Sequence, residues 1–159
     1  MTPFGIAGVQ MHVTVGSNLE AMRHRIDLVM HLYPWVQMIV FSELCVYGPL
    51  LPHAQPLPGE SEDELCTAAR RHGIWLVNGS MFERRDGHIH NTTSVIDPQG
   101  TVIGRYRKLY PFMPFEQGVT PGEDFPESAQ FAGVDYAQLV QRIRSRALMP
   151  RATSVQLPG

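Results

Sequence analysis

Val36-Gln37-Met38-Ile39-Val40-Phe41-Ser42-Glu43-Leu44-Cys45-Val46-Tyr47-Gly48 combines a short apolar run with a carboxylate directly behind it. The run from Met38 to Phe41 is typical of a strand that is buried on both faces of a sheet. Glu43 follows this run, and a turn at Tyr47-Gly48-Pro49 closes the stretch. A carboxylate at the C-terminal end of a buried strand is held by rigid backbone and is partly desolvated, which prepares it for proton transfer. We therefore expect Glu43 to be a functional acid or base; the alternative is a loop glutamate that merely follows a strand.

The residues before this stretch predict a strand, a helix and a second strand. Phe4 to Val9 is small and apolar throughout, as expected of a first strand. Apolar residues at helical spacing run from Leu19 to Tyr33, and Pro34 ends the run. Because Met38 to Phe41 comes next, the first forty residues predict a β-α-β unit, in which two parallel strands are joined by a right-handed crossover.

The residues after the stretch predict a loop, a second helix and a meander. Pro49 to Gly59 is rich in proline and must be irregular. Acidic residues begin a helix from Glu60 to His72, and Gly73 ends it. The further predicted strands are Ile74–Val77, continuing towards Phe82, then His88–Ile96 and Thr101–Tyr106, with hairpin turns at Asp86-Gly87 and Asp97-Pro98-Gln99-Gly100. This order predicts an α/β fold with one mixed sheet and helices on one face.

Composition limits the class of protein. The chain has 159 residues, 43% of them hydrophobic and 18% charged, which describes one ordinary globular domain. A net charge of −2 gives no electrostatic reason to expect nucleic acid or an anionic membrane as a partner. No apolar run approaches the ~20 residues that span a bilayer, and the N-terminus lacks a secretory signal pattern. The chain has two cysteines, and their spacing is not that of a metal-binding motif. Such a pair is more typical of a reducing compartment than of a disulfide scaffold. We expect a cytoplasmic protein.

A second charged motif lies near the end of the predicted meander. Lys108 stands at a strand end, and Glu116 follows eight residues later. The segment between them, Pro111 to Phe115, is rich in proline and aromatic residues and is therefore stiff and apolar. It is unusual for a lysine and a carboxylate to flank such an apolar loop. The alternative is a surface lysine and a solvated glutamate.

Taken with Glu43, this arrangement resembles the nitrilase, or carbon–nitrogen hydrolase, superfamily. The resemblance covers Phe4 to about Phe125. Its motifs are Val40-Phe41-Ser42-Glu43-Leu44, Arg105-Tyr106-Arg107-Lys108 and Glu116 with Pro121-Gly122-Glu123, supported by Gly8-Val9-Gln10, Trp75 to Ser80, Asn91-Thr92 and Ile96-Asp97. The resemblance implies an α-β-β-α sandwich, here incomplete. We expect residues 1–125 to be a truncated nitrilase-like domain and residues 126–159 to be a divergent tail.

The resemblance also implies a chemistry. Members of the family hydrolyse small amides, nitriles or carbamoyl compounds through a cysteine thioester, without a metal or cofactor. Glu43 matches the general base, Lys108 the donor to the developing oxyanion, and Glu116 a second acid that positions the substrate or the lysine. The candidate substrate-binding residues, which could line the pocket, are Tyr47, Phe112 and Phe115.

The nucleophile of the family is missing from this pattern. The family places a cysteine beyond the second acid and shortly before Phe-Pro-Glu, whereas here Phe125-Pro126-Glu127 follows Gly122-Glu123-Asp124 directly. Cys45 would point to the same side as Glu43 if the segment were extended, and Cys66 lies in a helical pattern that favours a packed, inert thiol. We expect an inactive or weakly active hydrolase. The alternative is a non-catalytic binding or regulatory subunit that pairs with a full-length relative.

The tail predicts one more helix, at about 136–149, capped by Asp135. Half of a two-sheet sandwich would leave an apolar sheet face bare, and such a face tends to find a partner. We therefore expect the tail helix to pack on the sheet or two chains to form a homodimer.

Two histidines raise the question of a metal. His88 and His90 lie two apart on a predicted strand and so share a face. No further ligand stands at a motif spacing, and no glycine-rich phosphate loop is present. A polar strand surface is therefore favoured, and we expect neither a metal nor a cofactor.

Overall fold

The computed structural model of the chain describes residues 4–123, which belong to one compact unit, Met1–Phe125. The helix expected at about 136–149 lies outside the described residues. The prediction that it packs on the sheet stays a prediction. Among residues 4–123, no helix has the length and apolar character that crossing a membrane requires.

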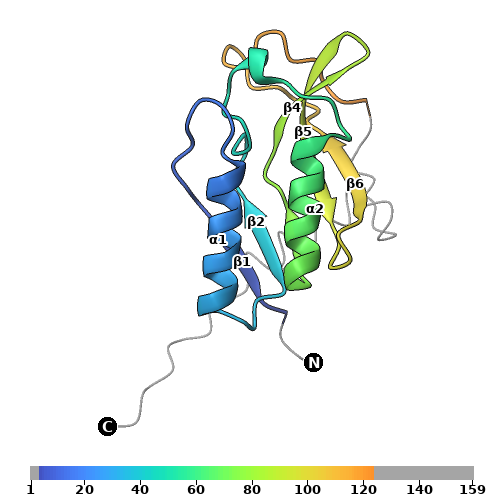
Figure 1. Cartoon of the computed structure of the whole chain (residues 1–159). Coiled ribbons are helices and arrows are strands. Elements are labelled where there is room, and N and C mark those ends of the chain that lie inside the picture. Colours follow the sequence, from blue (N-terminus) through green and yellow to red (C-terminus); the bar gives the residue numbers. More distant parts are fainter. Residues whose placement is uncertain (1–3, 124–159) are drawn as a thin grey trace, which may run out of the picture. The chain divides into compact units, whose positions relative to one another are not determined.

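A six-stranded mixed sheet forms the centre of the described part (Figure 1). Its elements are β1 (Ile6–Val9), α1 (Leu19–Leu32), β2 (Met38–Phe41), η1, a 3-10 helix (Leu51–His53), α2 (Glu60–His72), β3 (Trp75–Val77), β4 (Met81–Arg85), β5 (His88–Ile96) and β6 (Val102–Arg107). β1, β2 and β3 are parallel neighbours, whereas β5 runs antiparallel to β3, β4 and β6. The expected mixed sheet is confirmed.

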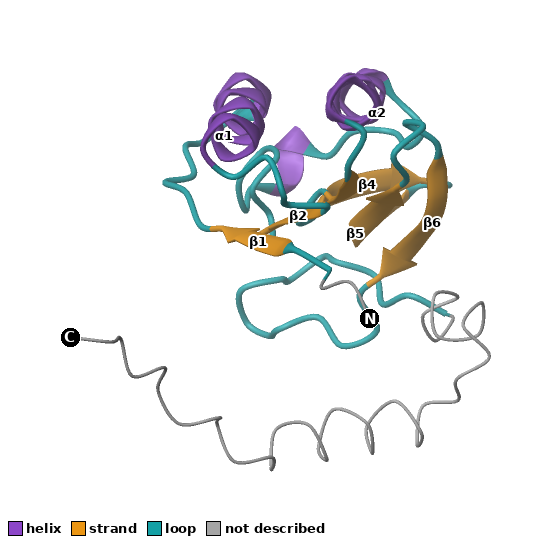
Figure 2. Cartoon of the chain, turned by 90° about the horizontal axis from the view of Figure 1, so that it is seen from below, coloured by secondary structure: helices purple, strands orange, loops and turns teal. Residues whose placement is uncertain are grey.

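Both helices cover the same face of this sheet (Figure 2). Their inward residues pack on that face to form the main core, which includes Met22, Ile26, Ile39, Phe41, Leu65, Ala69, Leu76, Met81 and Ile96. The burial of these apolar side chains is the main favourable contribution to folding. α2 starts with three acidic residues in its first turn and ends at Gly73, which adopts the left-handed conformation (φ 63°) that such a C-cap requires.

The opposite face of the sheet is less well covered. Ala7 and Val9 of β1 pack against the core, so Ile6, which alternates with them, points to the other face and is 60% exposed. The expectation that the tail or a second chain covers this face stays a prediction.

The strand that we expected to continue from Ile74 towards Phe82 is interrupted. β3 ends at Val77, and β4 begins as a separate strand at Met81. Gly79 causes the break, because its φ of +78° is incompatible with a continuous strand. Both strands still pair with β5, so the sheet continues across the interruption.

This break supports the loop that follows β2. A Cβ atom on Gly79 would stand 2.0 Å from the Ser42 carbonyl oxygen and 2.7 Å from Cys45 Sγ, so only glycine permits the observed approach. Ser80 Oγ accepts a hydrogen bond from the Leu44 amide at 2.8 Å, and the Thr93 hydroxyl donates to the Gly79 carbonyl. The loop after β2 is therefore fixed on both sides of Glu43.

We predict that Gly79→Ala destabilises the fold far more than Gly87→Ala. Both glycines have a φ near +80°, and a left-handed alanine costs roughly 1–2 kcal/mol. Only at Gly79 would the added methyl group also collide with backbone, since nothing lies within 4 Å of the site at Gly87. We expect a total loss of roughly 3 kcal/mol for Gly79→Ala, measured by urea unfolding. Equal losses in the two variants would contradict this close approach.

Candidate active site

Glu43 stands in a turn directly after β2. Leu44 adopts a positive φ of 53°, and Gly48 N donates to the Leu44 carbonyl oxygen at 3.0 Å, so the chain reverses within a few residues. Ile39 and Phe41 of β2 are buried, whereas Met38 and Val40, which face the other side of the sheet, are only partly buried. The side chain of Glu43 is 57% exposed. The turn thus presents a carboxylate to solvent from a rigid base, at the end of the sheet where the segment after β6 also lies (Figure 1).

Lys108 and Glu116 come from the end of β6 and the loop behind it. Lys108 N donates to the Asn91 carbonyl oxygen at 2.9 Å, and the Lys108 carbonyl oxygen accepts from Gly122 N at 3.0 Å. The loop closes on itself as well, because the Phe112 amide donates to the Glu116 carboxylate while Glu116 N donates to the Phe112 carbonyl oxygen. These bonds fix the positions of both charged side chains.

The three predicted residues meet in one cluster. Lys108 Nζ donates to Glu43 Oε1 at 2.8 Å and to Glu116 Oε2 at 2.6 Å. Glu116 is 5% exposed, so one carboxylate of the cluster is buried and the other reaches solvent. The residues come from segments far apart in the chain, and the sheet brings them together.

Asn91 is a fourth member, which we did not place in the site from the sequence. Its Nδ2 donates to Glu43 Oε1 and to Glu116 Oε1, each at 2.8 Å. Asn91 lies on β5, and its neighbour Thr92 points to the opposite face of the sheet. The sequence did offer one signal, because Asn91-Thr92 is among the motifs that support the family resemblance. The spacing of these two residues does not say which of their side chains faces Glu43 and Glu116.

Lys108 and Glu116 hold their charges at neutral pH. Burial would lower the pKa of Lys108, but hydrogen bonds to Glu116 and Glu43 outweigh it and raise that pKa above its usual value. Burial would likewise raise the pKa of Glu116, but the bonds from Lys108, the Phe112 amide and Asn91 outweigh it, and the pKa is lowered. The site therefore combines an ammonium donor with a carboxylate.

This chain matches the family model for carbon-nitrogen hydrolases over residues 5–142. It belongs to the carbon-nitrogen hydrolase family. The omega-amidase NIT2 of Danio rerio is 33% identical over 119 residues, a match that covers 70% of this chain and 42% of that protein. The human omega-amidase NIT2 is 34% identical over 82 residues, which cover 46% of this chain and 30% of that protein. The chain thus spans less than half the length of these relatives.

Solved structures show the same fold. Nit3 of Saccharomyces cerevisiae, a member of branch 10 of the nitrilase superfamily, has a TM-score of 0.68 at 21% identity, covering 76% of this chain and 49% of that one. A carbon-nitrogen hydrolase from Helicobacter pylori has a TM-score of 0.66 at 22% identity, covering 76% and 45%. The resemblance drawn from the sequence motifs and the expected fold class are confirmed.

The aromatic residues expected to bind substrate lie in two different settings. Phe112 and Phe115 belong to the loop that carries Glu116, are 63% and 79% exposed, and stack on each other with ring centroids 5.5 Å apart. Tyr47 is partly buried and packs against the main core. Their role in substrate binding stays a prediction.

Both cysteines of the chain lie buried in the described part of the structure. The segment around Cys45 is a turn and not extended, so the condition under which its thiol would point to the same side as Glu43 is not met. The thiol is fully buried instead, 3.9 Å from Met22 Sδ, and donates to the Asn78 carbonyl oxygen at 3.3 Å. Burial raises the pKa of Cys45 to about 11. Cys66 is also buried in α2, and burial raises its pKa as well.

The histidines His88 and His90 hold the end of the loop. His90 Nδ1 donates to the Thr120 carbonyl oxygen at 3.0 Å, and His88 Nδ1 lies 3.3 Å from Thr120 Oγ1. No group of three or more His, Cys, Asp or Glu side chains suited to a metal ion occurs in residues 4–123.

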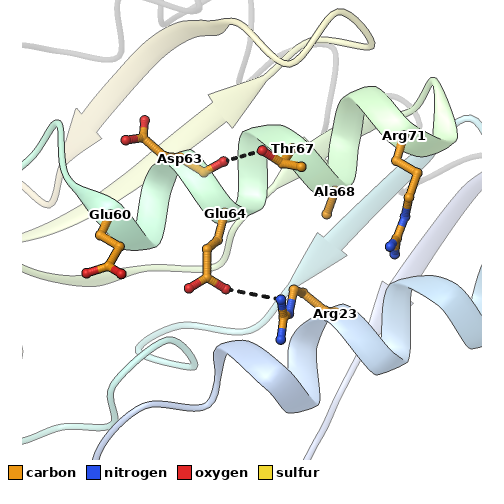
Figure 3. Close-up of a pocket in the computed structure, with 7 residues that line it drawn as sticks. All are labelled: Arg23, Glu60, Asp63, Glu64, Thr67, Ala68 and Arg71. Carbon is orange, nitrogen blue, oxygen red and sulfur yellow. Dashed lines mark hydrogen bonds and ion pairs between the residues drawn. The ribbon is translucent and has the colours of Figure 1, made fainter.

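A separate cleft of about 270 Å³ lies between the two helices (Figure 3). Its lining residues are Arg23, Glu60, Asp63, Glu64, Thr67, Ala68 and Arg71. Arg23 and Glu64 form an ion pair across it at 3.5 Å. The cleft shares no residue with the cluster around Lys108, and both of its arginines, Arg23 and Arg71, are already paired with carboxylates. We therefore take the carboxylate–lysine cluster, and not this cleft, as the candidate site.

Two ion pairs between partly exposed arginines and buried carboxylates fix β6, the strand that leads to Lys108. Arg107 donates to both oxygens of Glu83 at 2.7 Å, and Thr92 Oγ1 donates to the same carboxylate at 2.7 Å. Arg105 donates to Glu62 in the same bidentate manner. Burial alone would raise the pKa of Glu83, but the bonds from Arg107 and Thr92 outweigh it and lower that pKa.

We predict that Arg107→Leu costs roughly 3–5 kcal/mol of stability, because it leaves the fully buried Glu83 carboxylate unpaired. The control Arg85→Leu removes an exposed partner of Asp86 and should change stability by no more than about 0.5 kcal/mol. The lowered pKa of Glu83 stabilises the fold above the ordinary carboxyl value, and this contribution is lost as the pH falls through the lowered pKa. Urea unfolding between pH 3 and 7 measures both effects. A double variant, Glu83→Leu with Arg107→Leu, should recover most of the loss.

We predict that neither thiol reacts with a disulfide reagent at pH 8 while the protein is folded. A pKa of about 11 leaves about one thousandth of Cys45 as thiolate, and the core also blocks access. Both cysteines should react rapidly in urea, which is the internal control. Fast labelling of Cys45 in the folded protein would show that our assignment of this thiol to the core is wrong.

Proposed function

We propose that this chain carries the acid–amine part of a centre that hydrolyses small amides, nitriles or carbamoyl compounds. The observation that carries the proposal is the Lys108 ammonium, held between the carboxylates of Glu43 and Glu116. Membership of the carbon-nitrogen hydrolase family supports this class of reaction. Relatives named omega-amidase favour an amide over a nitrile.

In the proposed reaction, a nucleophile attacks the acyl carbon, and an electron pair moves onto the carbonyl oxygen. Lys108 uses two ammonium hydrogens for the carboxylates, so its third can donate to that oxygen and stabilise the negative charge. Glu43 takes the proton that the nucleophile loses. When the carbon–nitrogen bond breaks, the carbonyl re-forms and this proton passes to the leaving nitrogen. Water, which gives a proton to Glu43, then attacks the acyl carbon, and the nucleophile leaves and takes that proton back. Glu116 keeps Lys108 charged and in place.

The chain is proposed to lack the nucleophile of this reaction. Its sequence contains two cysteines, and both are buried away from the cluster. A thiol route therefore has no sulfur at Glu43. We infer that the 159-residue chain hydrolyses amides weakly or not at all. Free cysteines in place of a disulfide favour a cytoplasmic location.

A non-catalytic binding or regulatory subunit is the second candidate. Tyr110, Phe112 and Phe115 are all more than 60% exposed in the loop beside the cluster. Exposed aromatic side chains grouped in this way are typical of a contact surface. In this case the chain would pair with a second copy or with a full-length relative.

We predict that the purified chain releases no ammonia above background from a panel of short amides and carbamoyl amines. Any weak release should fall ~10² to 10³-fold in Lys108→Met, because the oxyanion donor is lost. It should be abolished in Glu43→Gln and unchanged in Cys45→Ser and Cys66→Ser. Turnover that disappears in both Glu43→Gln and Cys45→Ser would overturn the inactive assignment. Co-purification with a longer homologous chain would favour the second candidate.

A further inference from the structure

Asn91 has no role in the proposed reaction, yet it contacts all three charged residues of the cluster. Its Nδ2 bonds to Glu43 Oε1 and Glu116 Oε1, and its carbonyl oxygen accepts from Lys108 N. The side chain is 3% exposed. A buried amide with both hydrogens donated to carboxylates is fully committed to this site.

The four side chains form a closed ring. Lys108 Nζ joins Glu43 to Glu116 on one side, and Asn91 Nδ2 joins the same two carboxylates on the other. Glu43 uses Oε1 for both bonds, and no partner of Glu43 Oε2 is found within residues 4–123. The ring therefore fixes one oxygen of Glu43 and leaves the other to accept a proton.

An amide suits this position because it donates two hydrogen bonds without a charge. Two carboxylates on one ammonium repel each other, and the burial of Glu116 makes that repulsion stronger. A second cation would neutralise both acids and weaken the basicity of Glu43. A hydrophobic residue would leave both Oε1 atoms with one donor fewer. Asparagine avoids both outcomes.

We propose that Asn91 is a positioning residue: its amide holds Glu43 and Glu116 on either side of Lys108 and keeps Glu43 Oε2 free to accept a proton. This inference rests on the proposed function for its role in hydrolysis. The bridge itself is independent of turnover, so it can be tested in a chain that has no activity.

The test uses carboxyl ¹³C NMR titration of the full chain labelled at glutamate, with the Glu116 signal assigned by its loss in Glu116→Gln. Asn91→Leu removes both donors and keeps the branched shape of the side chain, although leucine is the larger residue. Because the Asn91 bond contributes to the lowered pKa of Glu116, its titration midpoint should move to higher pH in Asn91→Leu. The serine of Asn91→Ser is too short to reach both carboxylates, so this variant should also move the Glu116 midpoint to higher pH. It replaces Asn91→Leu in the test if the leucine variant does not fold.

Ser94→Ala is the matched control. Ser94 also lies on β5 and donates to a buried glutamate, Glu62, but on the helix side of the sheet. Its replacement should leave the Glu116 midpoint unchanged while lowering overall stability. An unchanged Glu116 midpoint in a folded Asn91 variant would overturn the bridge and leave the hydrolase proposal standing. Failure of ammonia release in every variant would not affect this result.

Discussion

The Lys108 ammonium between two carboxylates is the interaction on which the site depends. It joins the turn after β2, the end of β6 and the loop from Leu109 to Glu123 into one unit. Lys108 is the only lysine in the 159-residue sequence, and twelve arginines supply the other basic charges. A lysine presents a compact ammonium with three donors, and this geometry lets one group bind two acids and still face a substrate.

Most of the remaining structure serves to hold these three segments in place. Gly79 lies between β3 and β4, and its lack of a side chain lets this segment pack closely against the turn that carries Glu43. The pairs Arg107–Glu83 and Arg105–Glu62 fix β6 on the helix side of the sheet, while Lys108 acts at its end. Buried ion pairs of this kind contribute little net stability, but breaking one is costly, and they specify a single arrangement of the strand.

The sequence was sufficient to predict the sheet, α1, α2 and Glu43 at a strand end, because periodicity and the ends of strands are local signals. Lys108 and Glu116 were assigned a role only through the resemblance to the motifs of the family. The sequence did not predict the break at Gly79, since a buried apolar run looks the same whether or not a glycine inside it adopts a positive φ. It also did not place Asn91 in the site. The choice between Asn91 and Thr92 depends on strand register, which is set by contacts with β4 and β6 and not by the local sequence. Cys45 illustrates the same limit, because its direction depends on the turn.

The most direct test of the central interaction is the titration of Lys108 by ¹⁵N NMR. Selective lysine labelling gives one side-chain signal, because the sequence contains one lysine. The hydrogen bonds to Glu116 and Glu43 raise the pKa of Lys108, so this pKa should lie above that of a free lysine and fall in both Glu116→Gln and Glu43→Gln. A Lys108 that titrates identically in the unmodified chain and in both variants would contradict the account.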